Sequence, residues 1–157
     1  MKGIRGVLAQ RNLREVQGIV EKALIEYVDE RSEDPAMKYA KDILLAGGKR
    51  FRPVLGCLAY EAAGATLDDK MLRTALSAEI IHTATLVHDD IYDQAKLRRG
   101  RPTLHSQHGI AHGIISGDYL FTLGYWLGAE QGPEVIKVLA ETCIGLANGE
   151  LLQFDHI

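Results

Sequence analysis

The sequence predicts an all-α fold, and three observations lead to that prediction. Apolar residues recur at spacings of three and four through most of the 157 residues, which is the period of an amphipathic helix. The alternation of apolar and polar residues that marks a strand is weak everywhere. Glycine and proline separate the periodic segments, at points where helices end and begin. The pattern predicts one domain over residues 1–157, a bundle of about six helices.

Three helices are expected before residue 65. The first covers about residues 4–30, and one face of it carries Val16, Ile19, Val20, Ala23, Leu24 and Tyr27. Pro35 suits the first turn of a second helix, and the glycine pair at 47–48 suits its end. A third helix covers about residues 53–63 and stops at Gly64.

Three longer helices are expected in the rest of the chain. The first of them covers about residues 68–93, the next about 109–130, and the last runs from Gly132–Pro133 to the end. The segment LRRGRP at 97–102 reads as a loop. Frequent alanine and glycine in these helices would allow their backbones to pack closely.

Composition excludes several classes of protein. The net charge is −3, so no overall basic field favours binding to nucleic acid. No uninterrupted apolar run reaches about 18 residues, so no membrane span is expected. Cys57 and Cys143 lie in apolar surroundings far apart in the sequence. This placement favours reduced, buried thiols in a cytoplasmic protein over a single disulfide.

Three aspartates gather in the motif DDIYD, at the end of the expected 68–93 helix. At 100° per residue, Asp89 and Asp93 lie within about 40° of each other and about 6 Å apart along the axis. His82 falls on the same stripe, with Asp90 at its shoulder. Two carboxylates at this spacing repel by roughly 3 kcal/mol at an effective dielectric near 20, and they also oppose the helix dipole. A solvated helix end therefore fits poorly, whereas Mg²⁺, which accepts one or two carboxylates plus phosphate oxygens, fits well.

Two basic clusters flank this motif. One follows the aspartates and contains Arg98, Arg99 and Arg101. The other lies in the glycine-rich turn GGKRFRP and contains Lys49, Arg50 and Arg52. Either cluster alone is compatible with a solubilising loop, but guanidinium groups also bind phosphate oxygens in pairs. Two basic clusters beside a carboxylate pair indicate a site for phosphorylated substrates.

The segments GGKRFRP, IIHTATLVHDDIYDQAKLRRGRPTLH and GDYLF together resemble the trans-polyprenyl diphosphate synthases, the farnesyl and geranylgeranyl diphosphate synthase family. The resemblance covers nearly the whole chain from about residue 35. It implies a helical bundle of the isoprenoid synthase type, Mg²⁺ as cofactor, and a homodimer or heteromer. The implied reaction is the condensation of an allylic diphosphate with isopentenyl diphosphate, by ionisation, condensation and loss of a proton.

The resemblance also implies roles for individual residues. Asp89 and Asp93 would bind the Mg²⁺ that bridges to the allylic diphosphate, with Asp90 in support. Arg98 would hold the allylic diphosphate. Four side chains would hold isopentenyl diphosphate, namely Lys49, Arg52, His82 and Arg99. Two further basic residues are expected to be peripheral, namely Arg50 and Arg101.

Residues just before the acidic motif set product length in this family, because they form the floor of the pocket that receives the growing chain. Here these positions are Ala84 and Thr85, both small, with Ile81 one turn deeper. Helical geometry places Thr85 and Ile81 near the acidic stripe but turns Ala84 away from it. The resulting hypothesis is a product longer than C15.

The chain differs from the resembled family in length. Members of that family are about twice as long and carry a second aspartate-rich motif, which this chain does not contain. The expectation is an N-terminal half, inactive alone, with a short subunit that needs a partner as the alternative. Two other functions stay open: a subunit of a heteromeric prenyl synthase, and an all-α Mg²⁺-dependent diphosphate hydrolase. A transition-metal site at His105, His108 and His112 is a weaker alternative.

Overall fold

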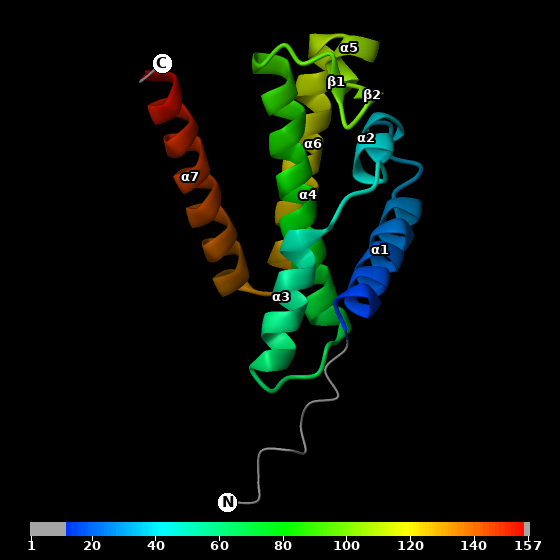
Figure 1. Cartoon of the computed structure of the whole chain (residues 1–157), viewed down its shortest axis with the longest axis vertical. Helices are drawn as coiled ribbons and strands as arrows, with labels where there is room; N and C mark the ends of the chain where they lie inside the picture. The colour runs from blue at the N-terminus through cyan, green and yellow to red at the C-terminus, as the bar shows by residue number, and fades with distance from the viewer. Residues whose placement is uncertain (1–11, 156–157) are drawn as a thin grey trace, which may run out of the picture.

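The computed structural model describes residues 12–155 of the chain. Within that range the chain is almost entirely helical, with one short hairpin (Figure 1). The elements in order are α1 (Leu13–Glu30), α2 (Met37–Leu44), α3 (Phe51–Ala62), α4 (Asp69–Tyr92), β1 (Leu97–Arg98), β2 (Arg101–Pro102), α5 (Leu104–His108), α6 (Ile110–Ala129) and α7 (Pro133–Asp155). The prediction of an all-α bundle is confirmed. Residues 4–11, which the sequence assigned to the first helix, lie outside the described range.

Several helix starts follow from local side-chain chemistry. Asn12 caps α1 through a reciprocal pair of hydrogen bonds. Its side-chain oxygen accepts from the backbone N–H of Glu15, and the Glu15 carboxylate accepts from the backbone N–H of Asn12, both at 3.0 Å. Asp68 caps α4 by accepting from the backbone N–H of Met71 at 2.8 Å. Pro133 begins α7 directly after Gly132, whose φ of 116° suits a glycine.

The centre of the fold is the antiparallel pair α4 and α6, which run side by side (Figure 1). Glycines on α6 face α4 side chains in register: Gly113 meets Ile91, Gly117 meets His88, and Gly124 meets Ile81. The pair is also joined by Ser77, whose hydroxyl donates to the Gly124 carbonyl at 2.8 Å. Because glycine has no Cβ, the two helices approach closely and α4 is held firmly along its length.

The hydrophobic core lies where α1, α2, α3 and α6 pack around α4. Its largest fully buried side chains are Leu24, Met37, Leu44, Ile80, Leu120, Leu127, Val16, Val20 and Cys57. The apolar face predicted for the first helix is largely confirmed, since Val16, Val20 and Leu24 are completely buried. The core therefore fixes α4 from several sides and leaves its C-terminal end to carry polar groups.

The structure departs from the predicted elements between α4 and α6. The segment predicted as a loop forms a hairpin in which Arg98 pairs with Arg101, and a further short helix, α5, follows it. The hairpin turn places Arg99 and Gly100 at φ of 52° and 77°. Two-residue strands and a five-residue helix are too short to show a hydrophobic period, so the sequence did not reveal them.

Helix α7 stands apart from the bundle (Figure 1). None of its residues is buried, and its exposed apolar side chains include Val138, Ile144, Leu146, Leu151, Leu152 and Phe154. Its C-terminal end touches α4 through Tyr92, whose hydroxyl donates to Glu150 at 3.0 Å and whose ring contacts Phe154. No helix among residues 12–155 is both long enough and apolar enough to cross a bilayer.

Candidate diphosphate-binding site

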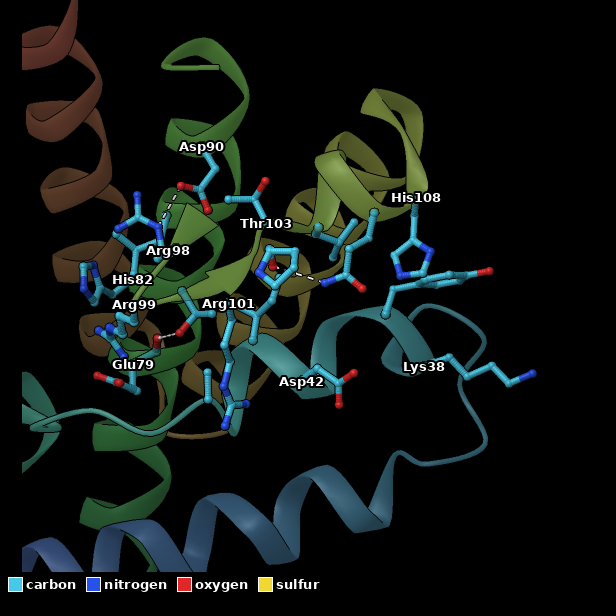
Figure 2. Close-up of a pocket in the computed structure, with 18 of the residues that line it drawn as sticks. Lys38, Asp42, Glu79, His82, Asp90, Arg98, Arg99, Arg101, Thr103 and His108 are labelled. Carbon is cyan, nitrogen blue, oxygen red and sulfur yellow. Dashed lines mark hydrogen bonds and ion pairs between the residues drawn. The ribbon is translucent and has the colours of Figure 1, made fainter. Parts of the chain in front are cut away.

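A cavity of about 360 Å³ lies against the C-terminal half of α4. Its walls come from α2, α4, the hairpin and α5, and Figure 2 shows His82, Arg98 and Arg99 near one end with Lys38 and His108 near the other. Aliphatic and aromatic side chains form part of the wall, among them Tyr39, Ile43 and Leu86. The cavity thus combines an apolar wall with a cluster of cationic groups.

Asp90 lies within this cavity rather than on the outer acidic face. It is 5% exposed, and its Oδ1 accepts from the Nε of Arg98 at 2.8 Å (Figure 2). Its backbone carbonyl also accepts from the Ala95 N–H at 2.9 Å, which closes the turn after α4. A buried carboxylate needs such a partner to offset its lost hydration. The pairing aims the Arg98 guanidinium and leaves Asp90 poorly placed as a metal ligand.

Asp89 and Asp93 do not line this cavity, and Asp89 is coupled electrostatically to Glu150 of α7. Burial raises the pKa of Asp89, and the negative charges of Glu150 and Asp93 raise it further, while Arg98 opposes them. Asp89 thus lies in the electric field of two further carboxylates, Asp93 and Glu150. Their mutual repulsion, combined with all-oxygen donors, fits a hard divalent cation such as Mg²⁺ that would be held by Asp89 and Asp93.

The pKa of His82 is affected by charges from both basic clusters. Burial lowers its pKa, the positive charge of Arg52 lowers it further, and Glu79 partly opposes this; Arg99 and Arg98 add smaller effects in the same direction as Arg52. The lowered pKa favours the neutral imidazole at pH 7, which can form hydrogen bonds but carries no charge.

The lowered pKa of His82 predicts that the free energy of unfolding depends on pH. Because the folded-state pKa of His82 lies below its unfolded value of about 6.5, the unfolded chain binds the proton more tightly. The contribution of His82 to the free energy of unfolding is therefore complete above about pH 6.5 and is lost as the pH falls toward the folded-state pKa. Urea unfolding of wild type and His82→Gln from pH 7.5 to 5 should show a shallower decline in the variant. His112→Gln, at an exposed histidine outside the cavity wall, is the control; parallel curves for His82→Gln would contradict the assignment.

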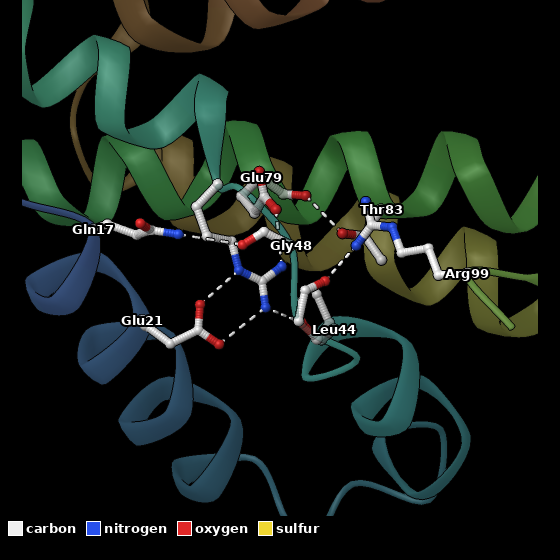
Figure 3. A network of polar contacts seen from close by, with 9 residues as sticks. Gln17, Glu21, Leu44, Gly48, Glu79, Thr83 and Arg99 are labelled. Atoms are coloured by element: carbon white, nitrogen blue, oxygen red, sulfur yellow. Dashed lines mark hydrogen bonds and ion pairs between the residues drawn. The ribbon is translucent and has the colours of Figure 1, made fainter. Parts of the chain in front are cut away.

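The two basic loops are tied to each other. The Arg99 guanidinium donates to the backbone carbonyl of Gly47, in the turn that carries Lys49 and Arg52 (Figure 3). Gly48 leaves room for that side chain, since a Cβ there would lie 2.8 Å from Arg99 Nη1. This bond brings the two basic loops together, as the sequence led us to expect. Lys49 and Arg52 themselves are exposed and do not line the cavity.

The expectation that Arg50 is peripheral is wrong. Arg50 is 4% exposed and its guanidinium bonds Glu21 on α1, Glu79 on α4 and the Leu44 carbonyl at the end of α2 (Figure 3). The other residue expected to be peripheral, Arg101, lines the cavity. Sequence reasoning missed Arg50 because both of its carboxylate partners lie 29 residues away along the chain.

The three residues assigned to chain length lie side by side on α4 but in different surroundings. Ala84 is completely buried in the core, and Ile81 is buried against Gly124 of α6. Thr85 is half-buried, and its hydroxyl donates to the His82 carbonyl at 2.8 Å. Of the three, Thr85 alone has substantial exposed surface.

No three His, Cys, Asp or Glu side chains between residues 12 and 155 lie in an arrangement that could hold a metal ion. The weaker alternative of a histidine metal site is therefore wrong: His108 and His112 instead contact Tyr39 through their rings.

The cavity also contains residues that no sequence motif suggested, namely Lys38, Tyr39, Asp42, Glu79 and Gln107. They come from separate elements, so only the folded chain brings them together.

Comparison with known proteins gives a consistent result. Residues 34–157 match the family described as polyprenyl synthetase. The chain is 42% identical over 120 residues to heptaprenyl diphosphate synthase component 2 of Geobacillus stearothermophilus, and 33% identical over 142 residues to geranylgeranyl diphosphate synthase of Methanosarcina mazei. These matches cover 76% and 87% of this chain, but it spans only 37% and 44% of the two relatives' own lengths.

A solved structure shares the fold. The geranylgeranyl pyrophosphate synthetase from the archaeon Geoglobus acetivorans superposes with a TM-score of 0.83 at 30% identity, over 91% of this chain and 48% of that one.

Proposed function

This chain belongs to the polyprenyl synthetase family, and on that premise we propose that it supplies the diphosphate-binding half of a trans-prenyl diphosphate synthase. The reaction is the condensation of an allylic diphosphate with isopentenyl diphosphate to a longer prenyl diphosphate. The observation that supports it best is the convergence of acid and base at one end of α4. Asp89 and Asp93 lie on one side of the helix end, and Arg98 and Arg99 lie on the other.

The arrangement suits departure of a diphosphate. Mg²⁺ held by Asp89 and Asp93 would supply charge neutralisation for the leaving group. Arg98, aimed by Asp90, offers its remaining N–H groups to phosphate oxygens. Arg99, Lys49, Arg52 and the neutral His82 would hold the second diphosphate, with His82 donating a hydrogen bond. An allylic cation would also have to be kept from water, which would otherwise capture it.

The test uses the full-length gene product with labelled isopentenyl diphosphate, an allylic diphosphate and Mg²⁺. Chain elongation supports the proposal. Release of phosphate without elongation would indicate a diphosphate hydrolase instead, and the absence of any turnover with intact folding and with any partner subunit supplied would overturn both.

One comparison favours a different subunit composition for an enzyme with the same activity. The relative from Geobacillus stearothermophilus is named as component 2 of its synthase. We propose as the alternative that this chain's protein acts within a heteromeric prenyl synthase. Activity that appears only when a separately encoded partner is added would support this arrangement over a homodimer.

Product length is proposed to depend on Thr85, the half-buried position one turn before Asp89. Thr85→Phe places a ring on the face that carries His82 and is expected to shorten the product. Thr74→Phe is the matched control, because the Thr74 hydroxyl likewise donates to a backbone carbonyl one turn back, that of Lys70, and Thr74 lies on the same face three turns away. Extraction and chromatography of the products measure the effect, and unchanged chain length in Thr85→Phe would remove the support for this proposal.

A further inference from the structure

Arg50 is the most heavily bonded side chain near the site. Its Nε donates to Glu21 at 2.7 Å, its Nη1 to Glu79 at 3.0 Å, and its Nη2 both to Glu21 at 3.2 Å and to the Leu44 carbonyl at 2.7 Å. The partners come from three helices, α1, α4 and α2, which Figure 3 shows meeting around the guanidinium. Four bonds to three elements leave little freedom for the residue that makes them.

The backbone at Arg50 is held in an unfavourable conformation. Its φ is 47°, a left-handed value that residues with a Cβ rarely adopt, and it immediately precedes the first turn of α3. No side chain caps that helix start. A left-handed residue that is not glycine persists when the surroundings determine its position, and the four guanidinium bonds do so here.

The residues next to Arg50 are those assigned to diphosphate binding. Lys49 precedes it directly, and Arg52 lies two residues on, in the first turn of α3. The turn is anchored further at Gly48, whose carbonyl accepts from the Gln17 side chain at 3.4 Å, and at Gly47, whose carbonyl accepts from Arg99. The direction in which Lys49 and Arg52 point is therefore set by the bonds of Arg50 and its neighbours.

Arg50 does not itself offer charge to an anion. It forms ion pairs with both Glu21 and Glu79, so the three side chains together carry a charge of −1. Burial by itself would lower the pKa of Arg50, but the bonds to these two carboxylates outweigh burial and raise that pKa, so the guanidinium stays charged and paired with them. Its effect on a bound diphosphate must act through geometry rather than through direct attraction.

We propose that Arg50 is a positioning residue that locks the Lys49–Arg52 turn to α1, α2 and α4, and so sets the affinity of the site for isopentenyl diphosphate. This inference rests on the proposed function. It separates two roles within one basic motif: Lys49 and Arg52 contact the ligand, and Arg50 aims them. Arg98, which Asp90 positions independently, is outside this arrangement.

The test is steady-state kinetics of the full-length gene product with two variants. Arg50→Lys keeps the charge, but one ammonium cannot reproduce four bonds in this geometry. The double variant Arg50→Met/Glu79→Gln keeps the net charge of the site. Both are expected to raise the KM for isopentenyl diphosphate roughly tenfold or more, as displaced supporting groups commonly do, with a much smaller change in kcat and in the KM for the allylic substrate.

The matched control is Arg73→Met/Glu130→Gln, which removes an exposed ion pair between α4 and the end of α6. It should leave all three kinetic constants unchanged. A normal KM for isopentenyl diphosphate in Arg50→Lys would show that charge alone suffices and would overturn the inference. Equal losses in kcat and both KM values, tracking a lower Tm, would show a purely structural role and would also overturn it.

Binding of inorganic pyrophosphate separates this inference from the proposed function. Wild type that neither elongates nor binds pyrophosphate would refute the proposed function and the inference with it. Wild type that does both, beside Arg50 variants with unaltered affinity, would refute the inference alone.

If the Arg50 variants do not fold, Glu21→Gln provides a milder test, since that carboxylate is 35% exposed. Trypsin should then cleave after Lys49 and after Arg50 faster than in wild type, with cleavage rates outside this turn unchanged. An unaltered rate after Lys49 would overturn the inference.

Discussion

Replacing Asp89 with asparagine in the full-length gene product is expected to lower the rate of prenyl transfer about a thousandfold. A metal ion that neutralises a leaving group contributes about 4 kcal/mol to transition-state stabilisation, and each 1.36 kcal/mol corresponds to about a factor of ten. Asp89→Asn removes the charge of one of two proposed ligands while keeping the size of the side chain. Initial rates at saturating substrate over a series of Mg²⁺ concentrations measure the loss.

The same variant should not be less stable. Burial and the neighbouring carboxylates raise the pKa of Asp89 above its unfolded value, so the folded chain binds that proton more tightly. The protonated carboxyl therefore contributes stability that is complete below the unfolded pKa and is lost as the pH rises through the folded-state pKa, so that ionisation at neutral pH lowers the free energy of unfolding. Asp89→Asn should match or exceed the wild-type Tm in the absence of metal.

The control for this experiment is Asp69→Asn, at an exposed aspartate in the first turn of the same helix. It should keep full activity. Activity of Asp89→Asn within tenfold of wild type, or a large fall in its Tm, would contradict the assignment of Asp89 to the metal.

Replacing Gly124 with valine is expected to destabilise the protein by about 3 kcal/mol, the upper range for overpacking a core. A Cβ at this position would lie 2.5 Å from Ile81 Cγ1, and 3.1 Å and 3.2 Å from the Ser77 carbonyl oxygen and the Ile81 backbone nitrogen. The backbone atoms cannot rotate away, so α4 and α6 must separate. At about 2–4 °C per kcal/mol for a chain of this size, Tm should fall by roughly 6–12 °C.

Gly18→Val is the matched control, because Gly18 is an exposed glycine in the interior of α1, and a Cβ added to it would meet no atom within 4 Å. Valine has a slightly higher helix propensity than glycine, so this variant should gain a few tenths of a kcal/mol. Thermal unfolding followed by circular dichroism compares the two. Equal Tm values for the two variants would show that α4 and α6 are not packed as closely as described.

Much of the fold could be predicted because long helices repeat their signal. The stripe of Val16, Val20 and Leu24, and the breaks at Gly64 and Gly132, place the helices to within a few residues. The hairpin and α5 could not be predicted, since each is shorter than one period of any pattern. Their position depends on Thr103, whose hydroxyl donates to the Ala95 carbonyl at 2.7 Å across the hairpin.

The candidate site was predictable only where residues share one helix. Helical geometry alone placed Asp89 beside Asp93, and the electrostatic coupling of the two carboxylates agrees with it. Which of the three aspartates would be buried depended on the path of the chain after α4. The hairpin places Arg98 beside Asp90, so Asp90 is the one that is buried and paired. The burial of Arg50 likewise depends on how α1 packs against α4, which no local pattern encodes.

The loose attachment of α7 has a thermodynamic consequence. Glu150 contributes to the acidic environment of Asp89 only while α7 keeps its place, and none of the residues of α7 is buried. A cation bound between the carboxylates and any surface packed on the outer side of α7 would favour the same position of that helix. By linkage each would then tighten the binding of the other, so the affinity for Mg²⁺ would rise when a surface packs against α7.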